Sequence, residues 1–201
     1  MDVKRRKAEQ SETTRRALLR AARELFAARG FAETPTEEIV QQAGVTRGAL
    51  YHHFEDKQAL FKAVFEELEV EFSQKVATAV MAAEGDLWKK LLAATNAFLD
   101  ACLEPEIQRI VLLDAPSVLG WETYRQMEEK HGAAQARAFL QEAMNAGVIE
   151  QRPVEPLAHL LLSSLHEGGL FIVNSDDVRA ARAEVGSILE RLLEGLKVRD
   201  G

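Results

Sequence analysis

Residues 44–61, GVTRGALYHHFEDKQALF, decide how the N-terminal part of this chain folds. Thr46 and Asp56 each stand just before residues whose apolar members recur at helical spacing. Short polar side chains of this kind accept a hydrogen bond from the first turn of a helix. We therefore expect Thr46 to cap a short helix over residues 47–53 and Asp56 to cap a long helix that follows it.

The sequence upstream of this stretch predicts two more helices. Apolar residues at helical spacing indicate a first helix over residues 11–29. Thr36 is expected to cap a short second helix, which Gly44 would end because glycine readily adopts a left-handed conformation. Two short helices joined by a glycine-containing turn and braced by a longer one predict a helix-turn-helix.

The helix expected over residues 47–53 has two different sides. Val45, Leu50 and Phe54 fall on one side and are expected to pack against the other two helices. The residues that fall on the outer side are Arg47, Gly48, Tyr51 and His52. Since the major groove of DNA admits one helix, a DNA duplex is the partner that fits this outer side best.

Each outer residue has a chemical role to offer. Arg47 can donate two hydrogen bonds to a guanine edge, and Gly48 lets the backbone approach closely. Tyr51 and His52 can donate to phosphate oxygens, although a single tyrosine here could also be half-buried in the core. His52 and His53 point about 100° apart on a helix, so they are not expected to bind one metal ion.

Positive charge gathers near the expected DNA face. Thr36, Thr46 and Lys57 stand at helix starts, where backbone N–H groups suit a phosphate. Residues 4–7 are basic and are expected to add mobile charge, unless they form a plain solvated tail. The net charge is −7, but residues 1–54 carry ten Lys/Arg against seven Asp/Glu, while residues 55–201 carry fifteen against twenty-five. A basic front on an acidic body can bind an anion locally.

The N-terminal segment resembles the tetracycline-repressor (TetR) family of bacterial transcriptional regulators over about residues 12–62. The matching residues are Leu25, Phe26, Gly30, Phe31, Thr36, Ile39, Ala43, Gly44, Val45, Gly48, Leu50, Tyr51, His53, Phe54, Lys57 and Leu60. Val40 departs from the alanine that is commoner in the family. Glu37 stands where some members read a base; it could accept from a cytosine amine or simply favour the helix dipole, and the dipole role is preferred. The resemblance implies that residues beyond Phe72 form a helical domain for ligand binding and dimerisation.

Composition excludes several other classes of protein. Of 201 residues, 47% are hydrophobic, enough for a core, and the single cysteine excludes an internal disulfide. No apolar run approaches the roughly 20 residues that span a bilayer. The N-terminal residues lack the apolar stretch of a secretion signal, so a cytoplasmic protein without a membrane partner is expected. Hydrolase, nucleotide-binding and metalloprotease motifs are missing, so neither an enzyme nor a cofactor is expected.

The whole chain reads as helical, which predicts an all-α fold of about nine helices. Five of them are expected after the fourth helix, with rough centres at Leu92, Ile110, Gln135, Leu161 and Leu189. We expect a helix-turn-helix domain with a basic N-terminal arm over residues 1–56 and a helical ligand-binding and dimerisation domain over residues 57–201. The fourth helix begins after Asp56 and runs towards Met81, so it is expected to belong to both halves.

Two apolar stripes near the C-terminus predict a homodimer. They lie on the helices expected around residues 157–172 and 181–196, and both are wide. Such stripes fit a four-helix bundle built from two subunits. The alternative is that both face the core of the same subunit. The dimer is favoured because DNA readers of this kind pair about a two-fold axis to reach two half-sites.

A ligand pocket should be mostly apolar with a few placed polar groups. Asp114 follows four apolar residues and could be a buried acid, although capping the turn before Pro116 is preferred for it. Gly168 and Gly169 lie inside a helical stripe, which suggests close helix contact or a pocket wall. The residues expected to bind a small-molecule effector are Phe98, Asp114, Trp121, Tyr124, Phe139 and His166.

The leading hypothesis is a repressor that binds a palindromic DNA operator as a homodimer and is released by a small molecule. An activator with the same parts is one alternative. A helical dimer that binds a small molecule without DNA is another, but it would require Arg47, Tyr51 and Lys57 to be incidental.

Overall fold

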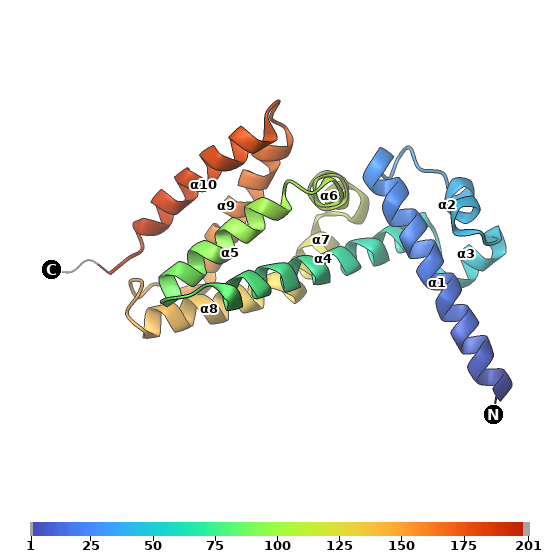
Figure 1. Cartoon of the computed structure of the whole chain (residues 1–201), viewed down its shortest axis with the longest axis horizontal. Coiled ribbons are helices and arrows are strands. Elements are labelled where there is room, and N and C mark those ends of the chain that lie inside the picture. Colours follow the sequence, from blue (N-terminus) through green and yellow to red (C-terminus); the bar gives the residue numbers. More distant parts are fainter. Residues whose placement is uncertain (1, 199–201) are drawn as a thin grey trace.

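The computed structural model describes residues 2–198, apart from the side chains of residues 2–4, 7, 128 and 131. Helices dominate this part of the chain, whose β-structure is limited to an isolated bridge between Ile149 and Lys197, so the predicted all-α class is confirmed. Figure 1 shows α1–α3 at one end and α4 leading into the remaining helices. The helices are α1 (Asp2–Arg29), α2 (Thr36–Ala43), α3 (Arg47–His53), α4 (Lys57–Ala82), α5 (Leu87–Ala101), α6 (Ala115–Leu119), α7 (Trp121–Glu128), α8 (Ala134–Asn145), α9 (Val154–Val173) and α10 (Val178–Glu194), with π-helical segments η1 (Ile107–Asp114) and η2 (Glu129–Ala133).

Local capping sets the ends of the helix-turn-helix. The Thr46 hydroxyl accepts a hydrogen bond from the Ala49 N–H at 3.2 Å, and the Asp56 carboxylate accepts from the Ala59 N–H at 2.7 Å, which confirms both predicted caps. The predicted cap at Thr36 is wrong. Pro35 takes the cap position, because its extended backbone (φ −74°, ψ 148°) suits it, and Thr36 becomes the first helical residue.

The first helix is longer than expected. It begins at Asp2, so the basic residues 4–7 continue α1 as helix. Arg5 donates to Glu9 one turn later at 3.0 Å, a pairing that supports this extension. The side chains of Lys4 and Lys7 lie outside the described part of the chain.

The middle of the chain is more broken than predicted. The single helix expected near Gln135 is replaced by α7, η2 and α8, and the helix expected near Ile110 is π-helical. Gly120 separates α6 from α7 with a φ of +77°, which a residue with a side chain rarely adopts. Each π-turn accommodates one residue more than an α-turn, and apolar periodicity does not reveal it.

One hydrophobic core joins the helix-turn-helix to the middle of the chain. It contains Phe26 of α1, Leu50 of α3 and Phe65 of α4, together with residues 107–127 from η1, α6 and α7. A second core lies between α5, α8, α9 and α10, around Met144. The first core contains residues from both sides of the predicted domain boundary at residue 56. The helices α1–α3 therefore share one core with residues of the second domain and do not form a separate one.

The two helical glycines of α9 allow close packing, as predicted. A Cβ on Gly168 would lie 2.8 Å from Cγ1 of Val185, and one on Gly169 would lie 3.0 Å from Sγ of Cys102. Real Cβ atoms essentially never come within 3.0 Å of such a neighbour, so a side chain on Gly168 would push α9 and α10 apart, and one on Gly169 would require Cys102 to shift by a few tenths of an ångström.

Candidate DNA-binding face and ligand cavity

Helix α3 buries one side and exposes the other, as the sequence predicted. Leu50 is fully buried and Phe54 nearly so, and both belong to the shared core. On the opposite side the Arg47 side chain is 65% exposed and Tyr51 is 44% exposed. This side therefore presents polar side chains to a partner while the apolar side fixes their position.

Arg47 is held in place before any partner binds. Its guanidinium lies 3.1 Å from the Glu37 carboxylate and 5.6 Å from the centre of the Tyr51 ring. Hydrogen bonds from the backbone N–H of Glu37 itself and from the Thr36 hydroxyl lower the pKa of Glu37, and the charge of Arg47 lowers it further. Glu37 is therefore an ionised acceptor on the same exposed face.

The rest of α3 leaves room for close approach. The nearest side-chain atom to a Cβ on Gly48 would be the Thr46 hydroxyl at 3.9 Å, so the backbone is open there. The rings of His52 and His53 lie 5.3 Å apart at 71°. His52 is exposed, whereas His53 is half-buried beside Phe54.

Lys57 has internal partners at the start of α4. Its ammonium group donates to the carbonyl oxygens of Phe31 at 2.8 Å and Thr34 at 3.0 Å, and lies 4.2 Å from the centre of the Phe31 ring. These contacts tie α4 to the loop after α1. Contact of Lys57 and Thr36 with phosphate stays a prediction.

A large cavity lies among α4, α5, α7, α8 and α9. Its volume is about 1080 Å³, and aliphatic and aromatic side chains dominate its wall. Asp114, predicted as a ligand-binding residue, is not in that wall. The predicted residues that do line the cavity are Phe98, Trp121, Tyr124, Phe139 and His166.

The polar groups of this wall include a hydrogen-bonded tyrosine–histidine pair. The Tyr124 hydroxyl and Nδ1 of His166 are hydrogen-bonded at 3.2 Å. The Tyr124 ring also stacks on Trp121, with ring centres 5.9 Å apart, and Trp121 is 60% exposed. Glu69 of α4, which sequence reasoning missed, is a buried carboxyl group in the same wall.

Asp114 connects the end of η1 to the loop after α1. Its carboxylate accepts from the backbone N–H of Phe31 at 2.7 Å and lies 3.5 Å from Nε of Arg109. Its side chain makes no capping hydrogen bond to α6, so the predicted cap is wrong as well as the predicted pocket acid. The Asp114 carboxylate instead bonds to Phe31, which lies 83 positions away along the chain.

Arg109 packs on the glycine that ends α1. A Cβ on Gly30 would lie 2.0 Å from the Arg109 guanidinium, and the φ of +83° also favours glycine. Nearby, the Gln58 side chain of α4 donates to the Val118 carbonyl of α6 at 2.6 Å. These contacts fasten η1 and α6 to the helix-turn-helix.

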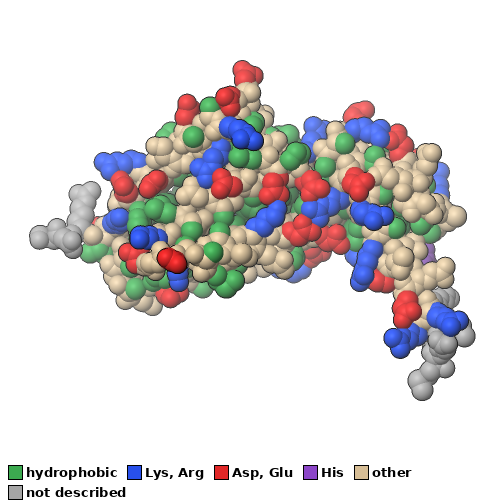
Figure 2. Space-filling view, in the orientation of Figure 1, with side chains coloured by type: hydrophobic (Ala, Val, Ile, Leu, Met, Phe, Trp, Pro, Cys, Tyr) green, Lys and Arg blue, Asp and Glu red, His purple; other side chains and the backbone are tan. Residues whose placement is uncertain are grey.

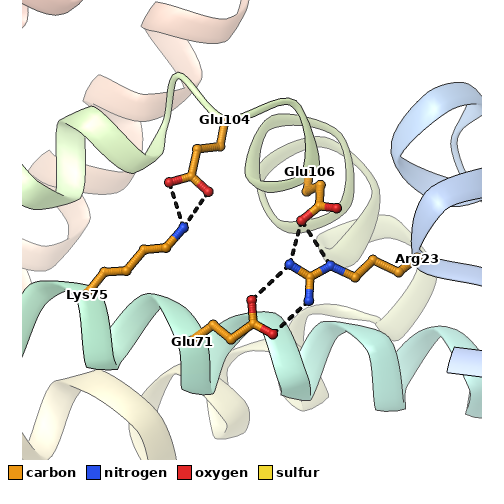
Figure 3. A network of polar contacts seen from close by, with 5 residues as sticks. All are labelled: Arg23, Glu71, Lys75, Glu104 and Glu106. Carbon is orange, nitrogen blue, oxygen red and sulfur yellow. Dashed lines mark hydrogen bonds and ion pairs between the residues drawn. The ribbon is translucent and has the colours of Figure 1, made fainter. Parts of the chain in front are cut away.

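An ionic network also connects α1 to α4 and to the residue before η1 (Figure 3). Arg23 of α1 donates to Glu71 of α4 at 2.7 and 2.8 Å and to Glu106 at 2.6 and 2.9 Å. Lys75 and Glu104 pair beside it at 2.5 Å. The hydrogen bonds that Arg23 donates lower the pKa of Glu71, and the same bonds, first the one to Glu71 and then the one to Glu106, raise the pKa of Arg23. Acidic and basic side chains crowd this junction in Figure 2.

Helices α9 and α10 carry apolar side chains on their outer surface. Helix α9 is long and apolar enough to cross a membrane by length and composition, although the sequence suggested no such run, and only 17% of that stretch is buried. Its exposed apolar residues and those of α10, each more than half exposed, are Leu160, Phe171, Ile188 and Leu192. Apolar exposure on this scale is typical of an interaction surface.

Comparison with known proteins finds similarity over both halves of the chain. Residues 18–64 match a family described as bacterial regulatory proteins, tetR family, and residues 88–196 match a tetracyclin repressor-like C-terminal domain. The crystal structure of a TetR-family transcriptional regulator from Pectobacterium atrosepticum is 36% identical in sequence and has a TM-score of 0.83, over 96% of this chain and 98% of that one.

Two curated relatives differ in how much of them is matched. The Tn10 TetC protein of Escherichia coli is 23% identical over 80% of this chain and 81% of that protein. The HTH-type transcriptional repressor BepR of Brucella suis is 48% identical over 31% of this chain, and the match spans only 29% of the repressor.

Proposed function

The chain belongs to the TetR family of helix-turn-helix transcriptional regulators, and we propose that it is a cytoplasmic repressor that binds a palindromic operator as a homodimer and releases it when a small molecule binds. The observation that carries this proposal is the division of α3 into a buried apolar side and an exposed side that bears Arg47, Gly48, Tyr51 and His52.

On DNA, α3 lies in the major groove. Arg47 reads a guanine, Gly48 admits the backbone, and Tyr51 and His52 contact phosphates. Glu37 shares the exposed face with Arg47, 3.1 Å away, and its charge in the first turn of α2 favours the helix dipole. Residues 1–56 act as the DNA-binding unit and residues 57–201 as the sensing and pairing unit, with α4 common to both.

Two subunits pair through α9 and α10. These helices lie at the end of the molecule remote from α2 and α3 (Figure 1). Pairing there leaves α3 of both subunits free to bind DNA. The exposed Leu160, Phe171, Ile188 and Leu192 supply the apolar area, and burial stabilises by roughly 25 cal/mol per Å². The apolar face of α9 then meets a second subunit and not lipid.

The effector enters the cavity among α4, α5, α7, α8 and α9. Segment η1 joins the two sites, because Ile107, Val111 and Leu112 line the cavity while Arg109 and Asp114 contact the loop after α1. An effector that favours a different position of η1 and α4 alters the separation of the two α3 helices in the dimer. To release most of the bound protein from DNA, the effector must bind the released conformation more tightly than the DNA-bound conformation by several kcal/mol.

The test is selection of bound duplexes from a random DNA pool, followed by affinity measurements on the recovered site. We expect an inverted repeat whose half-sites are about one helical turn apart, or a multiple of that spacing. The control is the Arg47→Ala variant, which should lose preference at one position of each half-site. Recovery of no consensus, with equal binding to random duplexes, would contradict the proposal.

A further inference from the structure

The exposed face of the helix-turn-helix carries a carboxylate beside the arginine that is proposed to read a base. Oε1 of Glu37, in the first turn of α2, lies 3.1 Å from Nη1 of Arg47, the first residue of α3. Oε2 of the same carboxylate accepts a hydrogen bond from the Thr36 hydroxyl at 3.2 Å. Both oxygens of Glu37 therefore have partners, and the carboxylate links the two helices of the motif.

Buried neighbours fix the distance between these two side chains. Ile39, two residues after Glu37, is fully buried in the core that α1–α3 share. Leu50, three residues after Arg47, is fully buried in the same core, and the Thr46 hydroxyl caps the start of α3. Side chains on packed helices are held more precisely than side chains on loops. The contact between Glu37 and Arg47 therefore follows from the packing of α2 against α3.

Two neighbours restrict the guanidinium of Arg47. Besides the contact with Glu37, it lies 5.6 Å from the centre of the Tyr51 ring, one turn along α3. A guanidinium has five N–H donors in a planar fork. Since Glu37 contacts Nη1, the donors on Nε and Nη2 can be presented together to a guanine edge. Restriction of the rotamers before DNA binds lowers the entropy cost of reading the base.

The same carboxylate opposes contact of Arg47 with phosphates. Binding to non-operator DNA depends chiefly on the charge of the phosphate backbone. Glu37 is ionised, because hydrogen bonds from its own backbone N–H and from the Thr36 hydroxyl lower its pKa. A negative charge 3.1 Å from the guanidinium offsets part of its attraction to a phosphate, whereas a guanine edge carries no net charge and loses less.

We propose that Glu37 is a positioning residue that sets the specificity of Arg47, because it holds the guanidinium for a guanine edge and withholds it from the phosphates of other DNA. The inference rests on the proposed function, in which α3 lies in the major groove. Glu37 acts through Arg47 and makes no base contact itself. Loss of the carboxylate therefore makes the protein bind random DNA more tightly and its operator less selectively.

The experiment measures binding of the full chain to three duplexes by fluorescence anisotropy. They are the operator recovered by selection, the same operator with adenine in place of guanine at the position that Arg47→Ala relaxes, and a random duplex of equal length. We expect Glu37→Gln to lower the preference for guanine over adenine by about two- to fivefold, an effect typical of one exposed ion pair. Binding to the random duplex should become tighter by a similar factor.

The matched control is Glu38→Gln. Glu38 is the next residue of α2, its side chain is 40% exposed, and it pairs with Arg29 of α1. This variant removes the same charge from the same helical turn, so it should change binding to all three duplexes by one common factor. Glu37→Asp keeps the charge on a shorter side chain and should retain part of the guanine preference. Thermal unfolding verifies that each variant is folded.

A double-mutant cycle tests whether Glu37 acts through Arg47. In the Arg47→Ala background, Glu37→Gln should change the affinities for the operator and for the random duplex by the same factor. The inference is overturned by an unchanged guanine preference in Glu37→Gln. It is also overturned if Glu37→Gln lowers the ratio of operator affinity to random-duplex affinity equally with and without Arg47.

Failure of this inference differs from failure of the proposed function. A wild-type protein that binds no duplex selectively contradicts the proposed function, and the role of Glu37 falls with it. Selective binding by the wild type, with the same guanine preference in Glu37→Gln, contradicts the role of Glu37 alone.

Discussion

Replacing Asp114 by alanine tests whether η1 fastens the sensing half to the DNA-binding half. The wild-type carboxylate accepts from the Phe31 N–H at 2.7 Å, and its side chain is 15% exposed. A hydrogen bond to a charged group contributes about 1.5–3 kcal/mol, and alanine offers no replacement acceptor. For a chain of this size we therefore expect the melting temperature to fall by roughly 3–12 °C.

The same change should weaken communication between the two sites. Without the Asp114 bond, movement of η1 is passed less well to the loop after α1, so an effector should change operator affinity by a smaller factor than in wild type. The assays are urea unfolding, effector binding by calorimetry, and operator affinity with and without effector. Asp114→Asn retains an acceptor oxygen and should fall between wild type and alanine in both stability and coupling.

A matched control is Glu122→Ala. Glu122 is exposed on α7 and contacts Gln126 within its own helix at 2.8 Å, so its removal should alter the free energy of unfolding by no more than about 0.5 kcal/mol. The reasoning is refuted if Asp114→Ala unfolds like the control and the effector still changes operator affinity by the wild-type factor.

Four further outcomes are expected. Arg47→Ala should cost about 1–3 kcal/mol of binding to the selected operator but much less on random duplexes, as measured by fluorescence anisotropy. Ile188→Glu places a charge on the exposed apolar surface of α10, outside the cavity wall, and should give helical monomers by sedimentation with weak operator binding; a stable dimer would exclude α10 from the interface. Burial raises the pKa of the Cys102 thiol to about 12, so a maleimide at pH 8 should label the protein only after unfolding. The hydrogen bonds from Arg23 lower the pKa of Glu71 below its ordinary 4.5. Their contribution to the free energy of unfolding is therefore present at neutral pH and is lost as the pH falls through the pKa of Glu71 in the folded protein. Glu71→Gln should flatten the decline of the melting temperature in this acidic range.

Features governed by neighbouring residues could be predicted from the sequence. The bounds of α3 and the caps at Thr46 and Asp56 depend on side chains within one turn of the backbone they bond. The buried positions Leu50 and Phe54 follow from helical spacing alone. Thr36 was misjudged because Pro35, directly before it, has the more suitable extended backbone.

Features that depend on distant residues could not be predicted. Asp114 bonds to a residue 83 positions away along the chain, and Arg23 bonds to residues 48 and 83 positions away. Nothing local specifies these partners. Five of the six predicted pocket residues do line the cavity. Glu69 was overlooked, although an acid between Phe65 and Phe72 on one helical face was a visible signal.

The hydrophobic core that runs from α1 into residues 107–127 limits how this protein can be re-engineered. A chimera that exchanges only residues 1–56 would cut through packed side chains, because Phe26 and Leu50 share this core with Tyr124 of α7. A biosensor built on this chain should therefore transplant individual base-contacting side chains onto α3. Exchange of residues 1–56 as a whole would require the incoming domain to carry a surface that matches η1, α6 and α7.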